Sequence, residues 1–226
     1  MPLAGIVFDF DGVLADSEPL HLRAYQDTLT PHGVELSAAD YYDRYLGFDD
    51  VGVFRAVARD RAWPCSQEAL DELILVKGER FEALAGQGEA LFPGAADCIR
   101  RTAAEVPIAI ASGGLGPEIE AMLSAAGLRH HFTAIVASGD TPRSKPDPDP
   151  YLRAVELLRP FTGPKDGRFV AIEDSMWGIE SAVAAGLRCI GVAHTYPAEQ
   201  LRTAHAVVST IADVSLDTAR ALCRTS

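Results

Sequence analysis

The chain has 226 residues, of which 48% are hydrophobic and 23% are charged, a balance typical of a globular protein with a buried core. Its formal net charge of −12 at pH 7 argues against general affinity for nucleic acids or acidic membranes. The four cysteines are far apart and form no C-x-x-C pair, which predicts reduced thiols and a cytoplasmic protein. The sequence also predicts neither a signal peptide nor a stretch that would span a bilayer.

The first predicted strand runs directly into two acidic residues. Residues 6–8 are an apolar run typical of a buried strand, and Asp9 and Asp11 follow it. Buried carboxylates are costly unless they are paired, hydrogen-bonded or bound to a metal. Gly12 permits a tight turn whose backbone N–H groups can face a ligand. This stretch is therefore a candidate functional site.

The segment after this turn is predicted to be helical. We expect helices over residues 20–32, 51–62 and 67–85, with Ser66 as the N-cap of the last, and no convincing strand. Such a block is too long to be a loop between a strand and a helix. The sequence thus predicts an inserted helical cap domain over residues 17–88, and a second domain built from residues 1–16 and 89–226.

From residue 92 onward, helices alternate with short apolar strands. Further strands are expected at residues 107–112, 134–137, 169–172, 189–192 and 206–208. Alternation of this kind is typical of βαβ units. We therefore predict an α/β fold, a doubly wound, Rossmann-like parallel sheet with helices on both faces.

Chemically active side chains follow several of these strands. They are Asp9 and Asp11 after the first, Ser112 and Gly113 after the second, Lys145 after the third, and Glu173 and Asp174 after the fourth. The carboxyl ends of parallel strands lie at one edge of the sheet, so these residues should converge there.

The converging residues suit phosphoryl transfer. Carboxylates can hold Mg²⁺, while a hydroxyl, an ammonium and turn N–H groups can hold the anion. Asp9, fixed by the buried strand, suits in-line attack on phosphorus. Asp11, on the turn, suits proton transfer to the leaving oxygen and later from water.

The complete pattern resembles the haloacid dehalogenase superfamily. The motifs that carry the resemblance are, in order, Asp9-x-Asp11-Gly12-x-x-x-Asp16-Ser17, then Ser112, then Lys145-Pro146, then Glu173-Asp174-Ser175 with Gly178. The resemblance covers essentially the whole chain. The insertion after the first motif resembles the subfamily with an α-helical cap, which includes phosphoglycolate phosphatases, sugar phosphatases and β-phosphoglucomutases.

This resemblance implies a role for each motif. Asp9 would be the nucleophile that becomes phosphorylated, and Asp11 the general acid and base. The residues expected to bind phosphate are Ser112, Gly113 and Lys145. The Mg²⁺ ligands would be the side chains of Asp9 and Asp174 and the backbone carbonyl of Asp11. Glu173, next to Asp174 in the chain, would complete the metal site, either as a direct ligand or as a neighbour of the ligands.

In the cap, His21, Gly47 and Lys77 are candidate substrate residues, because the β-phosphoglucomutase-like branch has a histidine, a glycine-led loop and a lysine at the matching places. Surface or packing roles for His21 and Lys77 are equally compatible with the sequence. Where that branch carries an arginine, this chain has Asp49-Asp50, which weakens the case for a mutase.

The leading hypothesis is a Mg²⁺-dependent phosphatase that acts on a small phosphorylated metabolite, such as a sugar phosphate. A β-phosphoglucomutase-like phosphomutase is the alternative enzyme, and a non-enzymatic binding protein on the same fold is a third hypothesis. Dehalogenase chemistry needs neither Asp11 nor a metal, and phosphonatase chemistry would need Lys77 as a Schiff-base lysine. No feature of the sequence demands more than a monomer, and the cap is expected to close over the core during catalysis.

Overall fold

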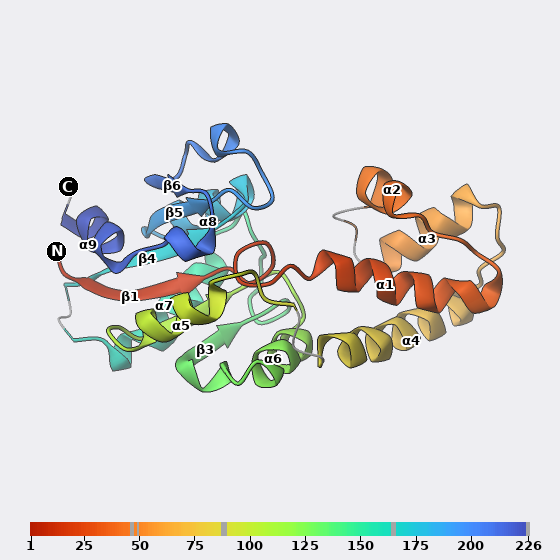
Figure 1. The fold of residues 1–226 in the computed structure, drawn as a ribbon, viewed down its shortest axis with the longest axis horizontal. Coiled ribbons are helices and arrows are strands. Elements are labelled where there is room, and N and C mark those ends of the chain that lie inside the picture. Colours follow the sequence, from red (N-terminus) through yellow and green to blue (C-terminus); the bar gives the residue numbers. More distant parts are fainter. Residues whose placement is uncertain (46–47, 49, 87–89, 164–165, 225–226) are drawn as a thin grey trace. The chain divides into compact units, whose positions relative to one another are not determined.

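The structure is a computed structural model that describes residues 1–45, 48, 50–86, 90–163 and 166–224. The chain forms two compact units, one of residues 1–16 and 88–226 and one of residues 17–87. We refer to them as the core and the cap (Figure 1). No helix in the described part of the chain is both long and apolar enough to cross a membrane.

The core is built on a six-stranded parallel sheet with the strand order β3-β2-β1-β4-β5-β6. Its strands are β1 (Leu3–Phe8), β2 (Ile108–Ala111), β3 (Phe132–Val136), β4 (Arg168–Glu173), β5 (Arg188–Val192) and β6 (Ala206–Val208). β1 lies at the centre, where Phe8 is in register with Ile110 of β2 and Ile172 of β4. The carboxyl ends of β1, β2 and β4 therefore lie side by side.

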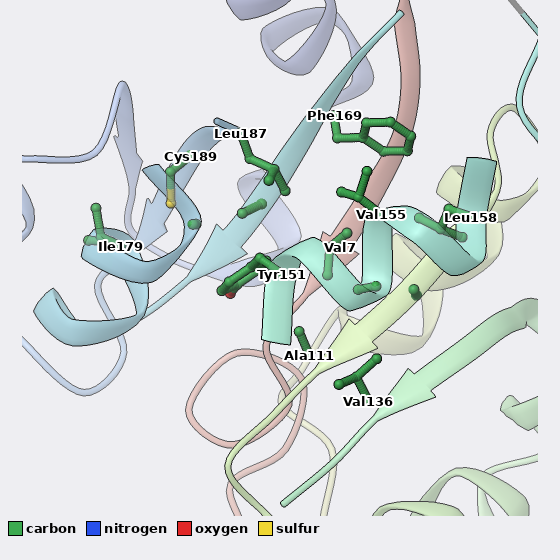
Figure 2. Packing of buried hydrophobic residues seen from close by; sticks show 14 of the residues in the cluster. Val7, Ala111, Val136, Tyr151, Val155, Leu158, Phe169, Ile179, Leu187 and Cys189 are labelled. Atoms are coloured by element: carbon green, nitrogen blue, oxygen red, sulfur yellow. The ribbon is translucent and has the colours of Figure 1, made fainter. Parts of the chain in front are cut away.

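The helices of the core are α5 (Ala95–Ala103), α6 (Gly116–Ala125), α7 (Asp149–Leu158), α8 (Met176–Ala184) and α9 (Leu216–Arg224). Short 3-10 helices cover Arg129–His131, Arg159–Phe161, Ala198–Leu201 and Ile211–Asp213. Apolar residues of α7 and α8, among them Tyr151, Val155 and Ile179, pack on Val7, Ala111 and Cys189 of the sheet (Figure 2). α9 packs against β1, β4 and β5.

Strands β1, β2, β4 and β5 bury nearly all of their side chains, because both faces of this part of the parallel sheet are covered by helices. This burial explains why the strands appear in the sequence as continuous apolar runs. The predicted α/β class and parallel sheet are confirmed, and each expected strand is present within a few residues of its predicted bounds. Helix α9 was not among the expected elements.

The chain leaves β1 and comes back to the core through a paired segment that we call the neck, residues 14–16 and 90–92. Ala15 and Leu91 form an antiparallel bridge. The backbone N–H of Asp16 donates to the carbonyl of Ala90 at 2.8 Å, and the N–H of Phe92 donates to the carbonyl of Leu14 at 3.0 Å. The segment that leaves the core and the segment that returns to it are thus hydrogen-bonded to each other.

The cap is helical. Its elements are α1 (Glu18–Leu29), a 3-10 helix (Thr30–His32), α2 (Ala38–Asp40), a π-helix (Tyr41–Tyr45), α3 (Asp50–Asp60) and α4 (Gln67–Ala85). α1 packs against α4 around a core that includes Tyr25, Phe54 and Leu73. The Ser66 hydroxyl accepts the Ala69 N–H at 3.2 Å, which makes it the N-cap of α4.

The first cap helix differs slightly from its expected span of residues 20–32. It begins at Glu18, because Pro19 is tolerated in the first turn, where its missing N–H is not needed. It ends as an α-helix at Leu29, and Pro31 sits in the 3-10 turn that follows. Gly33 then adopts a left-handed conformation with φ of 71° and terminates the helix.

Candidate active site

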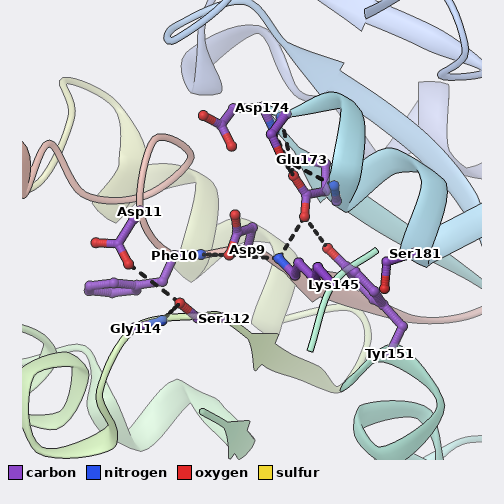
Figure 3. A network of polar contacts seen from close by, with 12 residues as sticks. Asp9, Phe10, Asp11, Ser112, Gly114, Lys145, Tyr151, Glu173, Asp174 and Ser181 are labelled. Atoms are coloured by element: carbon purple, nitrogen blue, oxygen red, sulfur yellow. Dashed lines mark hydrogen bonds and ion pairs between the residues drawn. The ribbon is translucent and has the colours of Figure 1, made fainter. Parts of the chain in front are cut away.

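The acidic, hydroxyl and ammonium groups that follow β1, β2, β3 and β4 meet at the carboxyl edge of the sheet (Figure 3). β1 delivers Asp9, and β4 delivers Glu173 with Asp174 next in the chain. Ser112 follows β2, and Lys145 comes from the loop between β3 and α7. All five side chains are largely removed from solvent.

Asp9 is held by two donors on the same carboxylate oxygen. The backbone N–H of Phe10 donates to Oδ1 at 2.8 Å, and the Lys145 ammonium lies 2.9 Å from the same atom. Within the described residues, these contacts leave Oδ2 as the oxygen able to face an incoming group. A carboxylate fixed through one oxygen in this way is oriented for nucleophilic attack through the other.

Asp11 and Ser112 lie next to each other across β1 and β2. The Ser112 hydroxyl donates to Asp11 Oδ2 at 3.4 Å and accepts the N–H of Gly114 at 2.9 Å. Gly113 lies in the same turn, and a β-carbon added to it would meet open space. The hydroxyl is thus anchored in a glycine turn beside the carboxylate expected to transfer protons.

Lys145 bridges two of the acids. Its Nζ lies 2.9 Å from Asp9 Oδ1 and 2.6 Å from Glu173 Oε1. Burial lowers the pKa of Lys145, but the charges of Asp9 and Glu173 outweigh it, so the pKa is raised above its usual value. The ammonium therefore stays charged and is placed to neutralise an anion next to Asp9.

Asp174 packs against the turn that carries Asp11. Gly12 has φ of 78°, and a β-carbon at that position would overlap the Asp174 carboxylate. Burial, with the neighbouring Glu173 charge, raises the pKa of Asp174 to about 7, while the Thr195 hydroxyl lowers it. Burial also raises the pKa of Asp9, opposed by Lys145 and reinforced by the charges of Glu173, Asp174 and Asp11.

The donor set fits a hard divalent cation. Carboxylate oxygens of Asp9, Glu173 and Asp174 lie within 4.8 Å of one another, and all three residues are buried. Three buried acids beside the Lys145 ammonium leave an excess of negative charge, which adds to the larger effect of burial in raising the pKa of Asp9 and Asp174. Oxygen ligands in this number suit Mg²⁺ and would offset that excess.

Two of the cap residues expected from the sequence lie close together. The Lys77 Nζ is 2.9 Å from His21 Nδ1 and 3.0 Å from Asp50 Oδ1, and Lys77 is only 1% exposed. His21 stacks on Phe81 with the ring centroids 4.2 Å apart. Burial, together with the Lys77 charge and opposed by Asp50, lowers the pKa of His21 to about 3.

The remaining cap expectations concern Gly47 and the acidic pair Asp49-Asp50. Gly47 and Asp49 lie outside the described residues. Asp50 itself accepts the Tyr25 hydroxyl at 2.6 Å in addition to its ion pair with Lys77. Asp50, the described member of this acidic pair, is thus engaged inside the cap.

Tyr151 and His194 are residues of the site that have no counterpart in the sequence-based prediction. Tyr151 donates its hydroxyl to Glu173 Oε1 at 2.8 Å. His194 accepts the Ile211 N–H at Nε2, so its Nδ1 carries the proton and donates to the Gly12 carbonyl at 3.0 Å. A signal for Tyr151 was available, because it occupies the apolar stripe of α7 and a buried tyrosine hydroxyl needs a partner.

The chain combines a parallel sheet, four converging motifs and a helical insertion. Comparison with models of known protein families shows to which class of hydrolases this combination belongs. The model of the haloacid dehalogenase-like hydrolases matches residues 3–186. The chain therefore belongs to the haloacid dehalogenase-like hydrolases. The expected family and the expected enzyme class, a hydrolase of the phosphatase type, are confirmed.

The chain is similar to several named proteins over most of its length. Protein CbbY of Cereibacter sphaeroides is 36% identical over 196 residues, which cover 83% of each chain. Fructose-1-phosphate phosphatase YqaB of Escherichia coli (strain K12) is 26% identical, over 84% of this chain and 96% of that protein. The crystal structure of a CbbY mutant from Rhodobacter sphaeroides in complex with xylulose-(1,5)bisphosphate has a TM-score of 0.78 and 30% identity, covering 96% of this chain and 99% of that one.

Proposed function

We propose that this chain is a Mg²⁺-dependent phosphatase that hydrolyses a small phosphorylated metabolite, of the sugar phosphate class, through a phosphorylated Asp9. The observation that carries the proposal is the pair of contacts on Asp9 Oδ1, 2.8 Å from the Phe10 nitrogen and 2.9 Å from Lys145 Nζ. They hold the second oxygen of a buried carboxylate ready to attack. The names of the relatives, a fructose-1-phosphate phosphatase and a protein crystallised with a sugar bisphosphate, support the substrate class.

The positions of the side chains support the following reaction. Oδ2 of Asp9 forms a bond to phosphorus as the bond to the leaving oxygen breaks, and Asp11 gives a proton to that oxygen. Asp11 then takes a proton from a water molecule, which attacks phosphorus, releases phosphate and regenerates the Asp9 carboxylate. Lys145, Ser112 and the N–H groups of the glycine turn would neutralise and orient the phosphoryl oxygens.

Asp9, Asp174 and the backbone carbonyl of Asp11 would hold the metal ion, with Glu173 beside them. When bound, Mg²⁺ supplies positive charge that offsets the repulsion between the Asp9 carboxylate and a phosphate dianion.

A phosphate-release screen over sugar and polyol phosphates, ranked by kcat/KM, tests the proposal. We expect turnover with Mg²⁺ and none after treatment with EDTA, with recovery when Mg²⁺ is added back. Conversion of a sugar 1-phosphate to its 6-phosphate without phosphate release would instead establish a phosphomutase. A protein inactive on p-nitrophenyl phosphate and on the whole panel would point to a non-enzymatic role.

A further inference from the structure

Tyr151 is a buried residue of α7 whose hydroxyl reaches the active-site acids. It is fully shielded from solvent and packs in the apolar cluster between the sheet and helices α7 and α8 (Figure 2). Its hydroxyl donates to Glu173 Oε1 at 2.8 Å. Its ring also lies under the Lys145 ammonium, with Nζ 5.1 Å from the ring centroid. One tyrosine thus contacts both members of the Lys145–Glu173 ion pair.

The Glu173 carboxylate is surrounded by donors. Oε1 accepts from Lys145 at 2.6 Å and from Tyr151 at 2.8 Å. Oε2 accepts from the backbone N–H groups of Asp174 and Ser175 at 3.1 and 3.3 Å, and from the Ser175 hydroxyl at 3.2 Å. A carboxylate offers about four lone-pair positions, so these five donors occupy both oxygens.

The same carboxylate is also fixed sterically. A β-carbon on Gly178, in the first turn of α8, would overlap the Glu173 carboxyl group. The Gly178 N–H donates to the Ser175 hydroxyl at 3.1 Å, and that hydroxyl in turn donates to Glu173. The start of α8 therefore closes around Glu173 and leaves little freedom for it to turn toward another partner.

Lys145 depends on this arrangement for its direction. A lysine side chain has a long flexible stem and a compact charge that by itself imposes little orientation. Its contacts with Glu173 Oε1 and Asp9 Oδ1 place the ammonium between the two carboxylates (Figure 3). Removing the Tyr151 donor would free one position on Oε1, so that this oxygen could shift within the small space that α8 leaves and the Lys145 ammonium could shift with it.

We propose that Tyr151 is a positioning residue: it fixes Glu173 so that this carboxylate aims Lys145 at Asp9, instead of serving as a direct ligand of the metal. This inference rests on the proposed function, because the group being aimed is the one that neutralises the phosphoryl oxygens. In this arrangement Glu173 orients Lys145, and the metal ligands are Asp9, Asp174 and the backbone carbonyl of Asp11.

The test is a double-mutant cycle with Tyr151→Phe and Glu173→Gln, and Tyr196→Phe as the matched control. Tyr196 is a partly buried core tyrosine whose ring packs edge-on against Trp177. We expect Tyr151→Phe to lower kcat/KM by about tenfold, the usual effect of removing such a supporting hydrogen bond, and Tyr196→Phe to leave it unchanged. The double variant should be no slower than Glu173→Gln alone, because Tyr151 acts through Glu173.

Mg²⁺ binding, measured by calorimetry without substrate, separates the two possible roles of Glu173. We expect the Kd of Tyr151→Phe to stay within about twofold of the wild type, and Glu173→Gln to weaken binding far less than Asp174→Asn. Equal losses in Glu173→Gln and Asp174→Asn would overturn the inference, and this comparison stands even if Tyr151→Phe does not fold. Additive losses in the cycle, or an unchanged Tyr151→Phe, would overturn it as well.

Failure of the proposed function gives a different result. A wild-type protein that releases no phosphate from any substrate contradicts the phosphatase itself. An active wild type whose Tyr151→Phe variant keeps full kcat/KM contradicts only the positioning role.

Discussion

The carboxylate of Asp174 occupies the space that a side chain on Gly12 would need. Gly12 belongs to the turn after β1 and Asp174 follows the neighbouring strand β4, so the segments that follow these two strands are in close contact where the acids collect. The backbone of Gly12 also has φ of 78°, in the left-handed region that favours glycine. Two independent constraints therefore act on this one position.

Gly12→Ala should separate these constraints when it is compared with Gly127→Ala. Gly127 also has a left-handed backbone, with φ of 67°, but an added β-carbon there meets nothing within 4 Å. We expect each variant to lose about 1 kcal/mol of unfolding free energy from backbone strain. Only Gly12→Ala should also displace Asp174, with at least about a tenfold loss of Mg²⁺ affinity and activity. Urea unfolding and phosphate release measure the two effects; full activity in Gly12→Ala would contradict the packing argument.

Asp9→Asn should abolish turnover without destabilising the protein. The substitution removes the attacking oxygen, and the loss of a nucleophile typically lowers kcat by at least about ten-thousandfold. It also removes a buried charge that Glu173, Asp174 and Asp11 disfavour, while Lys145 keeps its contact with Glu173. We therefore expect an unchanged or higher Tm. The exposed acid Asp97 of α5 provides the control, as Asp97→Asn should change neither quantity. Residual activity above a few per cent of wild type in Asp9→Asn would rule out the nucleophile assignment.

Ser112→Ala should weaken catalysis while leaving the sheet intact. It removes the hydroxyl that accepts the Gly114 N–H and donates to Asp11. A charge-assisted hydrogen bond to a phosphoryl oxygen contributes roughly 1.5–3 kcal/mol, so kcat/KM should fall by about tenfold to a hundredfold. Steady-state phosphate release measures the effect, with the exposed Ser138→Ala as the matched control. Equal rates for the two variants would remove Ser112 from the phosphate site.

The cap should lose stability as the pH falls because of His21. Burial, together with Lys77, lowers the pKa of this histidine in the folded chain to about 3, whereas an unfolded histidine titrates near 6.5. Between these values the unfolded chain binds one more proton, so the contribution of His21 is complete above pH 6.5 and declines toward pH 3. The free energy of unfolding should fall by up to about 2 kcal/mol between pH 7 and pH 5 from this group alone.

His21→Asn isolates that contribution from those of the other titrating groups. Urea unfolding at pH 7 and pH 5 should give a smaller decrease for this variant than for the wild type. If the free energy of unfolding falls by the same amount in both proteins, the assignment of a neutral His21 in the folded cap is wrong.

The sequence was most informative where a single segment determines its own structure. Buried strands of a parallel sheet are continuous apolar runs, so β1 and β4 were predictable, and the residues just beyond them had to meet at one edge. The acids Asp9 and Glu173 and the hydroxyl of Ser112 could therefore be placed together before any coordinates were known.

What sequence reasoning missed depends on contacts between distant segments. The hydrogen bond from Tyr151 to Glu173 joins residues 22 positions apart, on α7 and β4, and no spacing rule predicts it. The hydrogen bond from His194 to Gly12 spans 182 positions. The short α2 and the π-helix at Tyr41–Tyr45 were missed for another reason: no helix was expected there, because segments of three and five residues are too short to show a periodic apolar pattern.

The paired neck at residues 14–16 and 90–92 has a consequence for how such a chain can diversify. The two neck segments pair with each other through the Ala15–Leu91 bridge and the Asp16–Ala90 hydrogen bond. An inserted domain is therefore joined to the core at two adjacent points of the backbone. Any insert whose ends lie that close together can be grafted there without altering a sheet strand or a motif residue. Evolution can thus exchange the insert for another and keep the chemistry of Asp9 and its neighbours unchanged.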